Sequence, residues 1–455
     1  MMMKKLLSIA TLMMVALMLN AQAPSWTAQS TNFVAASRGI RWISIPSSQV
    51  VWCTAYDGSG GGADIREFCK TTNGGTNWTA TVIPTTQIAA TMALSTISAI
   101  DANIAYIAAY PTAGTVQGVF KTTNGGANWV NTSTGTFTNT SSFINNCGFW
   151  DADNGIAQGD AWGPGGTTQL FELYTTTNAG VNWAVVTDAN QPYAINAEDG
   201  WTTSFFNATF AGNKCAWFGT NKGRIFHTTN GGINWSVASS TFADCAGSIA
   251  FTDQNNGVAI CINGTSGAYL GFSRTTDGGA HWAAETTTGT IYKASVCAIP
   301  GHLGWYVRTG SDPNLTTEQG SQISFDYGVS WTEIDNSVQH TEVSFLDRDN
   351  GFSGGFSGAG TGIYKFVPGS VGIDFNSIEK NELNVYPNPC TGNFSLINAE
   401  NSVVNIYNTT GSLVYSAKIG NNKSFSIDLS KQAKGMYIVT VQNSKGTKTQ
   451  KLSIN

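Results

Sequence analysis

The sequence is poor in charged residues and in helix formers. Lysine, arginine, aspartate and glutamate make up only 11% of 455 residues, and the formal net charge is −5. A chain with so few basic groups is not expected to bind nucleic acid over its whole surface. Glycine (51 residues), threonine, asparagine and serine are frequent instead, which favours strands and turns. With 41% hydrophobic residues, the chain still has ample apolar surface to fold.

Histidine and cysteine are also few, at four and eight residues. No Cys-x-x-Cys pair and no cysteine–histidine cluster has the spacing of a zinc site. The Asp/Asn-Gly runs at 151–155, 253–257 and 347–351 lack the alternating oxygen ligands of a calcium loop. We therefore expect neither a metal site nor a cofactor.

Long apolar runs are absent except at the N-terminus. Lys4 and Lys5 precede the apolar run Leu6–Leu19, which small residues follow up to Ala23. This order is typical of a secretory signal peptide. About 14 apolar residues are too few to span roughly 30 Å of hydrocarbon. We predict that residues 1–23 direct export, with cleavage after Ala21 or Ala23, and that the mature chain has no transmembrane segment.

The C-terminal residues 382–455 differ in composition from the rest. They hold seven lysines and three acidic residues, a net charge of +4, which leaves −9 for the preceding chain. Residues 367–381 before them are expected to be a linker. Apolar segments between turn signals predict a small β-sandwich in the tail. Its expected strands are Leu383–Tyr386, Gly392–Ile397, Val403–Tyr407, Leu413–Ile419, Ser424–Asp428, Gly435–Val441 and Thr447–Ile454.

Short motifs occur along this tail in a fixed order. They are Val385-Tyr-Pro-Asn-Pro389, Gly392-Asn-Phe394, Val404-Asn-Ile-Tyr-Asn408 with Gly411, Lys434-Gly-Met-Tyr-Ile438 and Lys451-Leu-Ser-Ile454. The set resembles the type A C-terminal sorting domain of the type IX secretion system. The resemblance implies a Bacteroidota-type cell, recognition by the type IX machinery and transport across the outer membrane. It also implies that the tail is usually removed, leaving the product at the surface or in the medium. The alternative is an ordinary adhesive sandwich domain.

One motif recurs six times in the main body, for example as Thr122-Thr-Asn-Gly-Gly-Ala-Asn-Trp129. The tryptophans of the six copies follow one another at intervals of 51, 54, 52, 47 and 49 residues. A period near 50 suits four short strands with their turns, which form one blade of a β-propeller. The key residues of the copies are Asn73 and Trp78, Asn124 and Trp129, Asn178 and Trp183, Asn230 and Trp235, Asp277 and Trp282, and Asp326 and Trp331.

The two ends of this region complete one another. Residues 342–366 supply three strands after the last motif but no fourth strand. Ser25–Ala28 resembles Asn77–Ala80, which begins a fourth strand, and we expect it to pair with Gly362–Phe366. That pairing closes a ring and removes the open sheet edges. We predict an all-β protein, with a seven-bladed β-propeller over residues 24–366 closed by the N-terminal strand, and with the small sandwich behind it. Rings of six or eight blades also remain open.

The motif resembles the Asp-box (BNR) repeat S/T-x-D-x-G-x-x-W of sialidase-like and photosystem II assembly-factor-like propellers, and it is more similar to the latter group. The resemblance covers Trp26 to Phe366. An Asn or Asp side chain bonds the backbone of its own turn, and the glycines allow positive φ. The Trp is expected to pack between blades. The motif is therefore a folding device rather than a catalytic signature.

All eight cysteines follow the predicted signal peptide, and an exported protein is able to form disulfides. Cys53 and Cys69 flank the Gly58–Gly62 turn almost symmetrically and make the main candidate disulfide. Cys245 with Cys261 is a weaker candidate.

Loop length indicates the working face. Loops between the second and third strands, and between successive blades, vary in length, whereas the other turns are short. Variable loops on a rigid scaffold usually carry recognition. For each loop residue the alternative is a solvated or loop-packing role. The candidate binding residues are Trp162, Tyr193, Glu198, Asp199, Trp201, Arg308 and Asp312.

The leading hypothesis is a secreted or cell-surface recognition or adhesion propeller without catalytic residues. Loop tryptophan and tyrosine suit stacking on sugars or anchoring at a protein interface, so the expected ligand is a glycan or a protein. The tail serves as the delivery address.

Two other functions remain open. A sialidase-like glycoside hydrolase needs three funnel arginines, for which the strand pattern leaves Arg38, Arg41 and Arg308. A general glycosidase needs two carboxylates, and Glu198 or Asp199 with Asp312 are the candidates. The other function is an assembly or chaperone factor, which rests on fold analogy alone.

Overall fold

The structure is a computed structural model of the chain. It describes residues 23–455 except 114–115, 140, 163–168, 246, 288, 313, 370–383, 387, 389, 398, 400, 422–423 and 444–445. The predicted signal peptide, apart from Ala23, and most of the predicted linker lie outside the described residues. The chain divides into two compact units, Met1–Gly372 and Ile373–Asn455.

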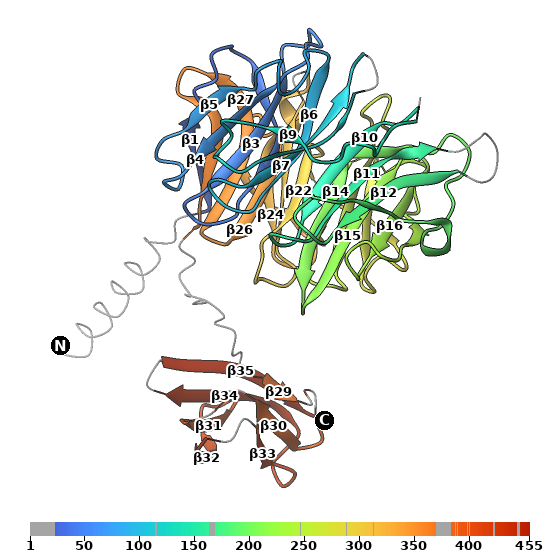
Figure 1. The fold of residues 1–455 in the computed structure, drawn as a ribbon. Helices are drawn as coiled ribbons and strands as arrows, with labels where there is room; N and C mark the ends of the chain where they lie inside the picture. Colours follow the sequence, from blue (N-terminus) through green and yellow to red (C-terminus); the bar gives the residue numbers. More distant parts are fainter. Residues whose placement is uncertain are drawn as a thin grey trace, which may run out of the picture. The chain divides into compact units, whose positions relative to one another are not determined.

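The first unit is built from antiparallel sheets in chain order (Figure 1). Five sheets have four strands each, paired in sequence order. They are β6 (Met92–Ala99), β7 (Ala105–Pro111), β8 (Gly118–Thr122) and β9 (Val130–Asn131); β10 (Ile144–Phe149), β11 (Gly155–Trp162), β12 (Leu170–Thr176) and β13 (Ala184–Val185); β14 (Gly200–Phe210), β15 (Asn213–Thr220), β16 (Arg224–Thr228) and β17 (Ser236–Ser239); β18 (Ser248–Phe251), β19 (Gly257–Ile262), β20 (Tyr269–Thr275) and β21 (Ala283–Glu285); and β22 (Ser295–Ala298), β23 (Tyr306–Ser311), β24 (Gln319–Ser324) and β25 (Thr332–Asp335).

The remaining strands of this unit form one eight-stranded sheet with two halves. A single residue pair, Gly39 with Phe356, joins the halves. One half holds β2 (Arg38–Ser44), β3 (Val51–Asp57), β4 (Glu67–Thr71) and β5 (Thr79–Val82), and the other holds β26 (Val343–Asp347), β27 (Asn350–Gly358), β28 (Thr361–Val367) and β1 (Ser25–Ser30).

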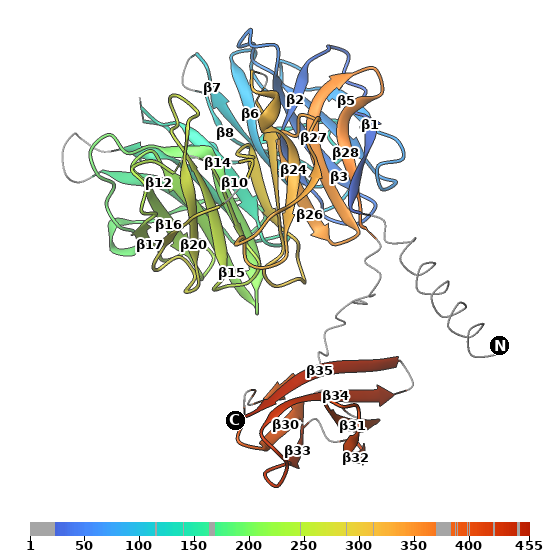
Figure 2. The same ribbon diagram turned by 180° about the vertical axis from the view of Figure 1, so that it is seen from behind.

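The first strands of the sheets contact one another in a closed circuit. The contacts run from β2 through β6, β10, β14, β18, β22 and β26 and return to β2. In both views the late strands β27 and β28 lie beside the early strand β1 (Figures 1 and 2). Four-stranded sheets arranged around such a circuit are a β-propeller. The second strands β3, β7 and β11 are buried over their first five residues, because neighbouring sheets cover both of their faces.

The N-terminal strand closes the circuit as predicted. β1 pairs with β28 in antiparallel register, with Trp26 opposite Phe366 and Ala28 opposite Tyr364. The indole Nε1 of Trp26 donates to Ser321 Oγ at 2.8 Å, on a strand of another sheet. The Trp26 ring packs on His340, Phe345 and Phe366, with centroids 5.4, 6.3 and 5.1 Å away. Strand β1 therefore supplies both the last ladder and part of the core.

The six repeated motifs fold into the same hydrogen-bonded turn. In one copy the Asn178 Oδ1 accepts the Thr176 hydroxyl at 3.0 Å and the Asn182 backbone N–H at 2.9 Å. The Gly180 N–H donates to Thr176 Oγ1 at 3.0 Å. Asp277 and Asp326 accept equivalent bonds in their copies. The interchange of Asn and Asp in the sequence follows, because the turn uses an acceptor oxygen that both side chains have.

Each motif tryptophan contacts an aromatic ring of its own or the preceding sheet. Trp129 lies edge-on to Phe68 of the preceding sheet, with centroids 5.7 Å apart. A Cβ at Gly126, where φ is 91°, would meet the same Phe68 ring, so this turn position requires glycine. The other pairs are Trp78 with Phe352, Trp183 with Phe149, Trp235 with Phe218, Trp282 with Phe251 and Trp331 with Phe272.

The second unit is a two-sheet β-sandwich, as the tail sequence predicts. One sheet holds β29 (Asn384–Tyr386), β30 (Asn393–Ile397) and β33 (Ser424–Asp428), and the other holds β32 (Leu413–Ile419), β31 (Ser402–Asn408), β34 (Gly435–Asn443) and β35 (Gly446–Ile454). Phe394 and Ile427 from the first sheet share one core with Ile406, Val439 and Leu452 from the second.

Helices are nearly absent from the described residues. Two 3-10 turns, Asp188–Asn190 and Thr316–Glu318, stand between strands. Within the described ranges, none is long and apolar enough to cross a membrane.

The main disulfide expectation is wrong. Cys53 and Cys69 do stand opposite one another on β3 and β4, but both are free thiols. Burial raises the pKa of the Cys53 thiol, which suppresses the thiolate needed for oxidation. The disulfide joins Cys245 to Cys261, the pair that the sequence favoured less.

Replacing the closing tryptophan is expected to destabilise the propeller. Trp26→Ala removes three ring contacts and the bond to Ser321, so we expect the free energy of unfolding to fall by roughly 2–4 kcal/mol. Chemical denaturation of the mature protein, followed by tryptophan fluorescence and circular dichroism, measures the change. The matched control is Trp162→Ala, at a side chain that is 39% exposed. Equal stability of the two variants would contradict the closing role of Trp26.

Candidate functional site

A cavity of about 490 Å³ opens where the second strands of several sheets end. We call it the main cavity. Its volume lies within the usual range for small-ligand sites. The described residues that line it come from four sheets and their loops: Tyr56, Asp57, Gly58, Gly60, Thr203, Gly247, Ile262, Gly267, Lys293, Ala294, Ser311, Asp312, Asn314, Glu318 and Phe356.

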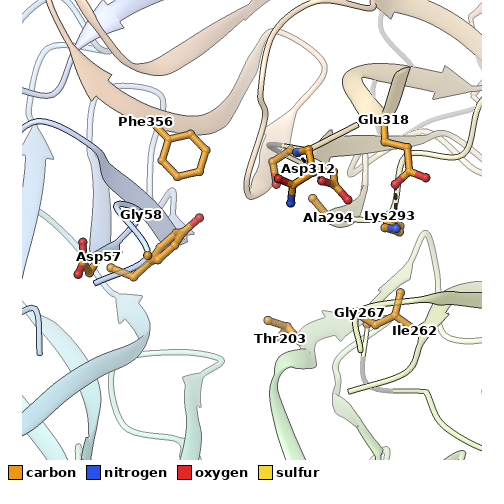
Figure 3. Close-up of a pocket in the computed structure, with 15 residues that line it drawn as sticks. Asp57, Gly58, Thr203, Ile262, Gly267, Lys293, Ala294, Asp312, Glu318 and Phe356 are labelled. Carbon is orange, nitrogen blue, oxygen red and sulfur yellow. Dashed lines mark hydrogen bonds and ion pairs between the residues drawn. The ribbon is translucent and has the colours of Figure 1, made fainter. Parts of the chain in front are cut away.

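The charged groups of the main cavity are held on two sides (Figure 3). On one side, Asp57 accepts hydrogen bonds from the Ser59 backbone, the Ser59 hydroxyl and Ala63 at 3.0, 2.6 and 2.9 Å. These bonds lower the pKa of Asp57 to about 2, so it is ionised at neutral pH. On the other side, Lys293 Nζ lies 2.8 Å from Glu318 Oε2. Asp312 Oδ1 accepts the Asn314 N–H at 2.8 Å.

Aromatic and small polar groups complete the wall. Phe356 and Tyr56 face the cavity from β27 and β3, and their ring centroids are 6.1 Å apart. Burial raises the pKa of Tyr56 to about 12, so the phenol is neutral. Ser311 and Asn314 add hydrogen-bonding groups. The wall therefore offers two ring edges, several polar groups and carboxylates that bind their own loops.

The structure separates the three arginines that the sequence placed near the funnel. Arg308 is buried with 1% exposure, and its guanidinium donates to Gln322 Oε1 at 2.8 and 2.6 Å and lies 4.3 Å from the Trp331 centroid. Its suggested role as a ligand contact is therefore wrong, because the side chain is buried and these protein groups hold its guanidinium. Arg38 Nε donates to Glu67 Oε1 at 2.9 Å.

Arg41 is in a different environment. It stands on β2 where the register with β3 shifts, between Ile40 and Trp42. Its guanidinium carbon lies 5.4 Å from the Tyr56 centroid and 5.9 Å from the Tyr110 centroid. Its Nε is buried and has no hydrogen-bond acceptor among the described residues.

Glu198 is also occupied by the protein. It is buried with 1% exposure, and it accepts bonds from Thr220 Oγ1 at 2.7 Å, from the Ile195 N–H at 2.9 Å and from Arg224 at 3.0 Å. These contacts anchor the loop before β14. Its suggested role as a free contact or catalytic carboxylate is therefore wrong.

The other loop candidates are spread over the same face. Asp312 lines the main cavity. Trp162 and Tyr193 are 39% and 46% exposed on neighbouring loops, which the Gln169–Ala194 bridge joins. Asp199 is exposed and accepts a bond from Asn221 Nδ2 at 3.1 Å. The Trp201 ring lies over Gly264, where a Cβ would clash with it, so it packs a loop. The structure thus brings one of the seven candidates to the main cavity.

The sequence reasoning missed Tyr56, Lys293, Glu318 and Phe356. It relied on loop length, whereas Tyr56 and Phe356 belong to strands β3 and β27. A sequence signal for the Tyr56 position does exist, because the first threonine of each motif marks a fixed point on the second strand. Thr71, Thr122 and Thr176 pair there with Val51, Ala105 and Gly155. Five residues later come Tyr56, Tyr110 and Asp160, which hold equivalent places in three sheets.

Asp160 is a carboxyl group with an unusual titration. Its Oδ1 accepts the Asn145 amide at 2.7 Å and the Gly200 N–H at 3.0 Å. Burial raises the pKa of Asp160 to about 7, and the charges of Asp199 and Glu172 act in the same direction. Such a group is half protonated at neutral pH.

A second cavity of about 330 Å³ lies between the β6–β9 and β10–β13 sheets, with Trp183 and Tyr174 in its wall. Across the described part of the chain, no three or more histidine, cysteine or acidic side chains gather where they would hold a metal ion.

Comparison with known families identifies the tail. Residues 384–455 match the secretion system C-terminal sorting domain, so the prediction of a type IX sorting tail is confirmed. Such a domain implies export to the cell surface or beyond. No curated protein matches the sequence.

Solved structures resemble the chain only distantly. A YCF48 structure bound to a D1 peptide is 14% identical, with a TM-score of 0.49 over 76% of this chain and 97% of that one. PorZ, a surface component of the type IX system of Porphyromonas gingivalis, is 12% identical, with a TM-score of 0.45 over 90% and 58%. The arabinofuranosidase Arb93A of Fusarium graminearum is 13% identical, with a TM-score of 0.38 over 62% and 94%. At these scores, none of the likenesses bears on function.

Asp160 is expected to make stability depend on pH. The unfolded chain releases this proton near pH 4 and the folded chain near pH 7, so the folded state binds more protons between these values. Stability therefore falls as pH rises through this window and is level above it. Asp160→Asn keeps the acceptor oxygen without the charge and should remove up to about 4 kcal/mol of this loss.

Denaturant unfolding of the wild type and of Asp160→Asn at pH 5 and pH 8 measures the effect. The variant should be the more stable protein at pH 8, and its advantage should be clearly smaller at pH 5, where only part of the loss has developed. Asp349→Asn, at an exposed carboxylate that does not act on Asp160, is the matched control. A variant less stable than the wild type at pH 8 would show that the Asp160 charge stabilises the fold.

Proposed function

We propose that this protein is an exported, non-catalytic recognition propeller that presents the main cavity and its loop face at the cell surface or in the medium. A signal peptide at residues 1–23 starts export, a propeller at 24–366 binds the ligand, and a linker at 367–381 joins it to the sorting domain at 382–455. The observation that carries the proposal is one chain that joins a sorting domain to a ring of sheets with a ligand-sized cavity.

We further propose that the ring has seven blades built on Asp-box turns. The circuit of contacting first strands passes through β2, β6, β10, β14, β18, β22 and β26, one strand for each four-stranded unit. The eight-stranded sheet counts as two blades, since the single Gly39–Phe356 pair joins its halves. The common hydrogen-bonded turn supports the resemblance to Asp-box propellers.

Recognition fits the cavity better than catalysis does. A glycosidase needs one carboxyl group to give a proton and a second to act as nucleophile or base. In the main cavity Glu318 is paired with Lys293, and Asp57 and Asp312 bind their own loops. Asp160, with its raised pKa, is the one observation that favours a glycoside hydrolase, and turnover assays address it directly.

Binding at the main cavity is tested with a variant that fills it. Ala294 lines the cavity and Leu303 lies in the turn at the opposite end of the same sheet, with 57% exposure. We expect the mature protein to bind members of a glycan array, Ala294→Trp to lose that binding by at least about 10-fold, and Leu303→Trp to retain it. Fluorogenic glycosides are assayed in parallel.

Each outcome decides a point. Turnover that Asp160→Asn abolishes would replace the recognition proposal with a hydrolase. Glycan binding that survives Ala294→Trp but not Trp162→Ala would move the site to the outer loops. An array without any signal would contradict glycan recognition and leave a protein ligand.

The sorting role of the tail is tested by deleting it. In a cell with a type IX system, a chain ending at residue 383 should stay in the periplasm, while the full chain reaches the surface or medium. Fractionation and immunoblotting measure the distribution. A reporter carrying a signal peptide and residues 382–455 is the control and should be exported. Surface delivery of the truncated chain would contradict the proposal.

A further inference from the structure

Arg41 carries a positive charge that the protein does not neutralise. Among the described residues it has no hydrogen-bond acceptor and no ion-pair partner. The other six arginines of the sequence all have one. Their partners are Glu67 for Arg38, the Ala90 carbonyl for Arg66, Glu198 for Arg224, Glu285 for Arg274, Gln322 for Arg308 and the Gly369 carbonyl for Arg348.

Strand register places Arg41 at the level of the main cavity. Four residues hold equivalent places on the first strands of their sheets, namely Ser44, Phe206, Ala250 and Cys297. On the second strands they pair with Trp52, Trp217, Val258 and Val307, in that order. Each of those partners in turn pairs with the residue just before the motif's first Thr or Ser. The residues three positions before Ser44, Phe206, Ala250 and Cys297 are therefore also equivalent, and they are Arg41, Thr203, Gly247 and Ala294.

Three of these four residues line the main cavity. Arg41 occupies the same level on β2, which contacts β6 and β26 in the circuit. The same count gives Ser95, Asn145 and Thr341 on the remaining first strands, so Arg41 is the charged side chain of this level.

Two tyrosine rings hold the guanidinium. Its carbon lies 5.4 Å from the Tyr56 centroid and 5.9 Å from that of Tyr110, within cation–π range. Tyr56 also lines the main cavity, so the Arg41 charge adjoins that space. Burial keeps the Tyr56 phenol neutral, and it therefore does not compensate the cation. The register shift at Arg41 is what turns this side chain away from the regular ladder.

We propose that Arg41 binds the carboxylate of an acidic saccharide, such as a uronic acid residue, in the main cavity. A guanidinium pairs with a carboxylate through two parallel N–H···O bonds, and such bonds are strong where water is partly excluded. The rings of Tyr56 and Phe356 give apolar edges for contact with a sugar, and Ser311 and Asn314 give partners for hydroxyl groups. These groups favour a saccharide over a peptide as the carrier of the carboxylate. The inference rests on the proposed recognition function and names its ligand class.

The test is a titration of the mature protein with oligogalacturonate and with a neutral galactose oligomer of equal length. The wild type should bind the acidic oligomer more tightly. Arg41→Gln should weaken acidic binding by about 10- to 100-fold and leave neutral binding unchanged, because it removes one charge-assisted pair. Arg66→Gln, at an arginine that is bonded to the Ala90 carbonyl and does not line the cavity, is the matched control. Arg41→Lys keeps the charge but not the planar fork, and it should recover part of the affinity.

The possible failures are distinct. Equal affinity of wild type and Arg41→Gln for the acidic oligomer overturns the inference and leaves the recognition proposal standing. Binding of peptides through a free C-terminal carboxylate, lost in Arg41→Gln, overturns the saccharide assignment. Absence of binding on the glycan array and in the titration overturns both the inference and glycan recognition, and leaves a protein ligand for the propeller. Circular dichroism and unfolding curves verify that Arg41→Gln is folded, and Arg41→Lys repeats the comparison if it is not.

Discussion

The propeller depends on the antiparallel ladder between β1 and β28. A row of sheets has two free edges, and free strand edges pair with other chains. Here Ser25–Ser30 cover the last strand of the ring, and Trp26 reaches on to Ser321 of the preceding sheet. The two ends of a unit of more than 300 residues are therefore fixed together by six residue pairs. A cavity between sheets keeps its shape only if this ladder keeps the ring closed.

Within the ring, the repeated turns and the main cavity lie at opposite ends of the strands. At one end the repeated turns bind their own backbones through Thr, Asn or Asp side chains, and their tryptophans lock onto neighbouring rings. At the other end the strands finish in irregular loops, and the main cavity opens there. The same division explains why polar side chains abound although few charges are present. Most of them are satisfied inside turns, as Asn178 is.

Small shifts in strand register explain how residues of several first strands reach the level of the main cavity. The ladders of the first strands are irregular near Arg41, Asn145 and Thr203, and each shift turns a side chain out of the regular alternation. Residues far apart in the sequence thereby reach one level of the ring. Arg41 lies at this level without an acidic partner. Arg38, only three residues before it, is neutralised by Glu67.

The all-β class, the closing strand, the repeated turns and the sorting tail could all be predicted from the amino-acid sequence. Each of these features depends on local chemistry or on a repeated pattern. Glycine allows positive φ and an Asn or Asp side chain supplies the acceptor of the turn. Alternating apolar residues mark the strands, and the order of the tail motifs can be recognised without knowing how the tail packs. Tertiary structure alone decided which side chains face the main cavity and which are consumed by partners. Arg308 and Glu198 read as exposed contacts in the sequence, yet Gln322 and Arg224 bind them in the interior. The choice of disulfide followed the same rule, since the distance between Cys245 and Cys261 is set by the fold and not by their spacing in the chain.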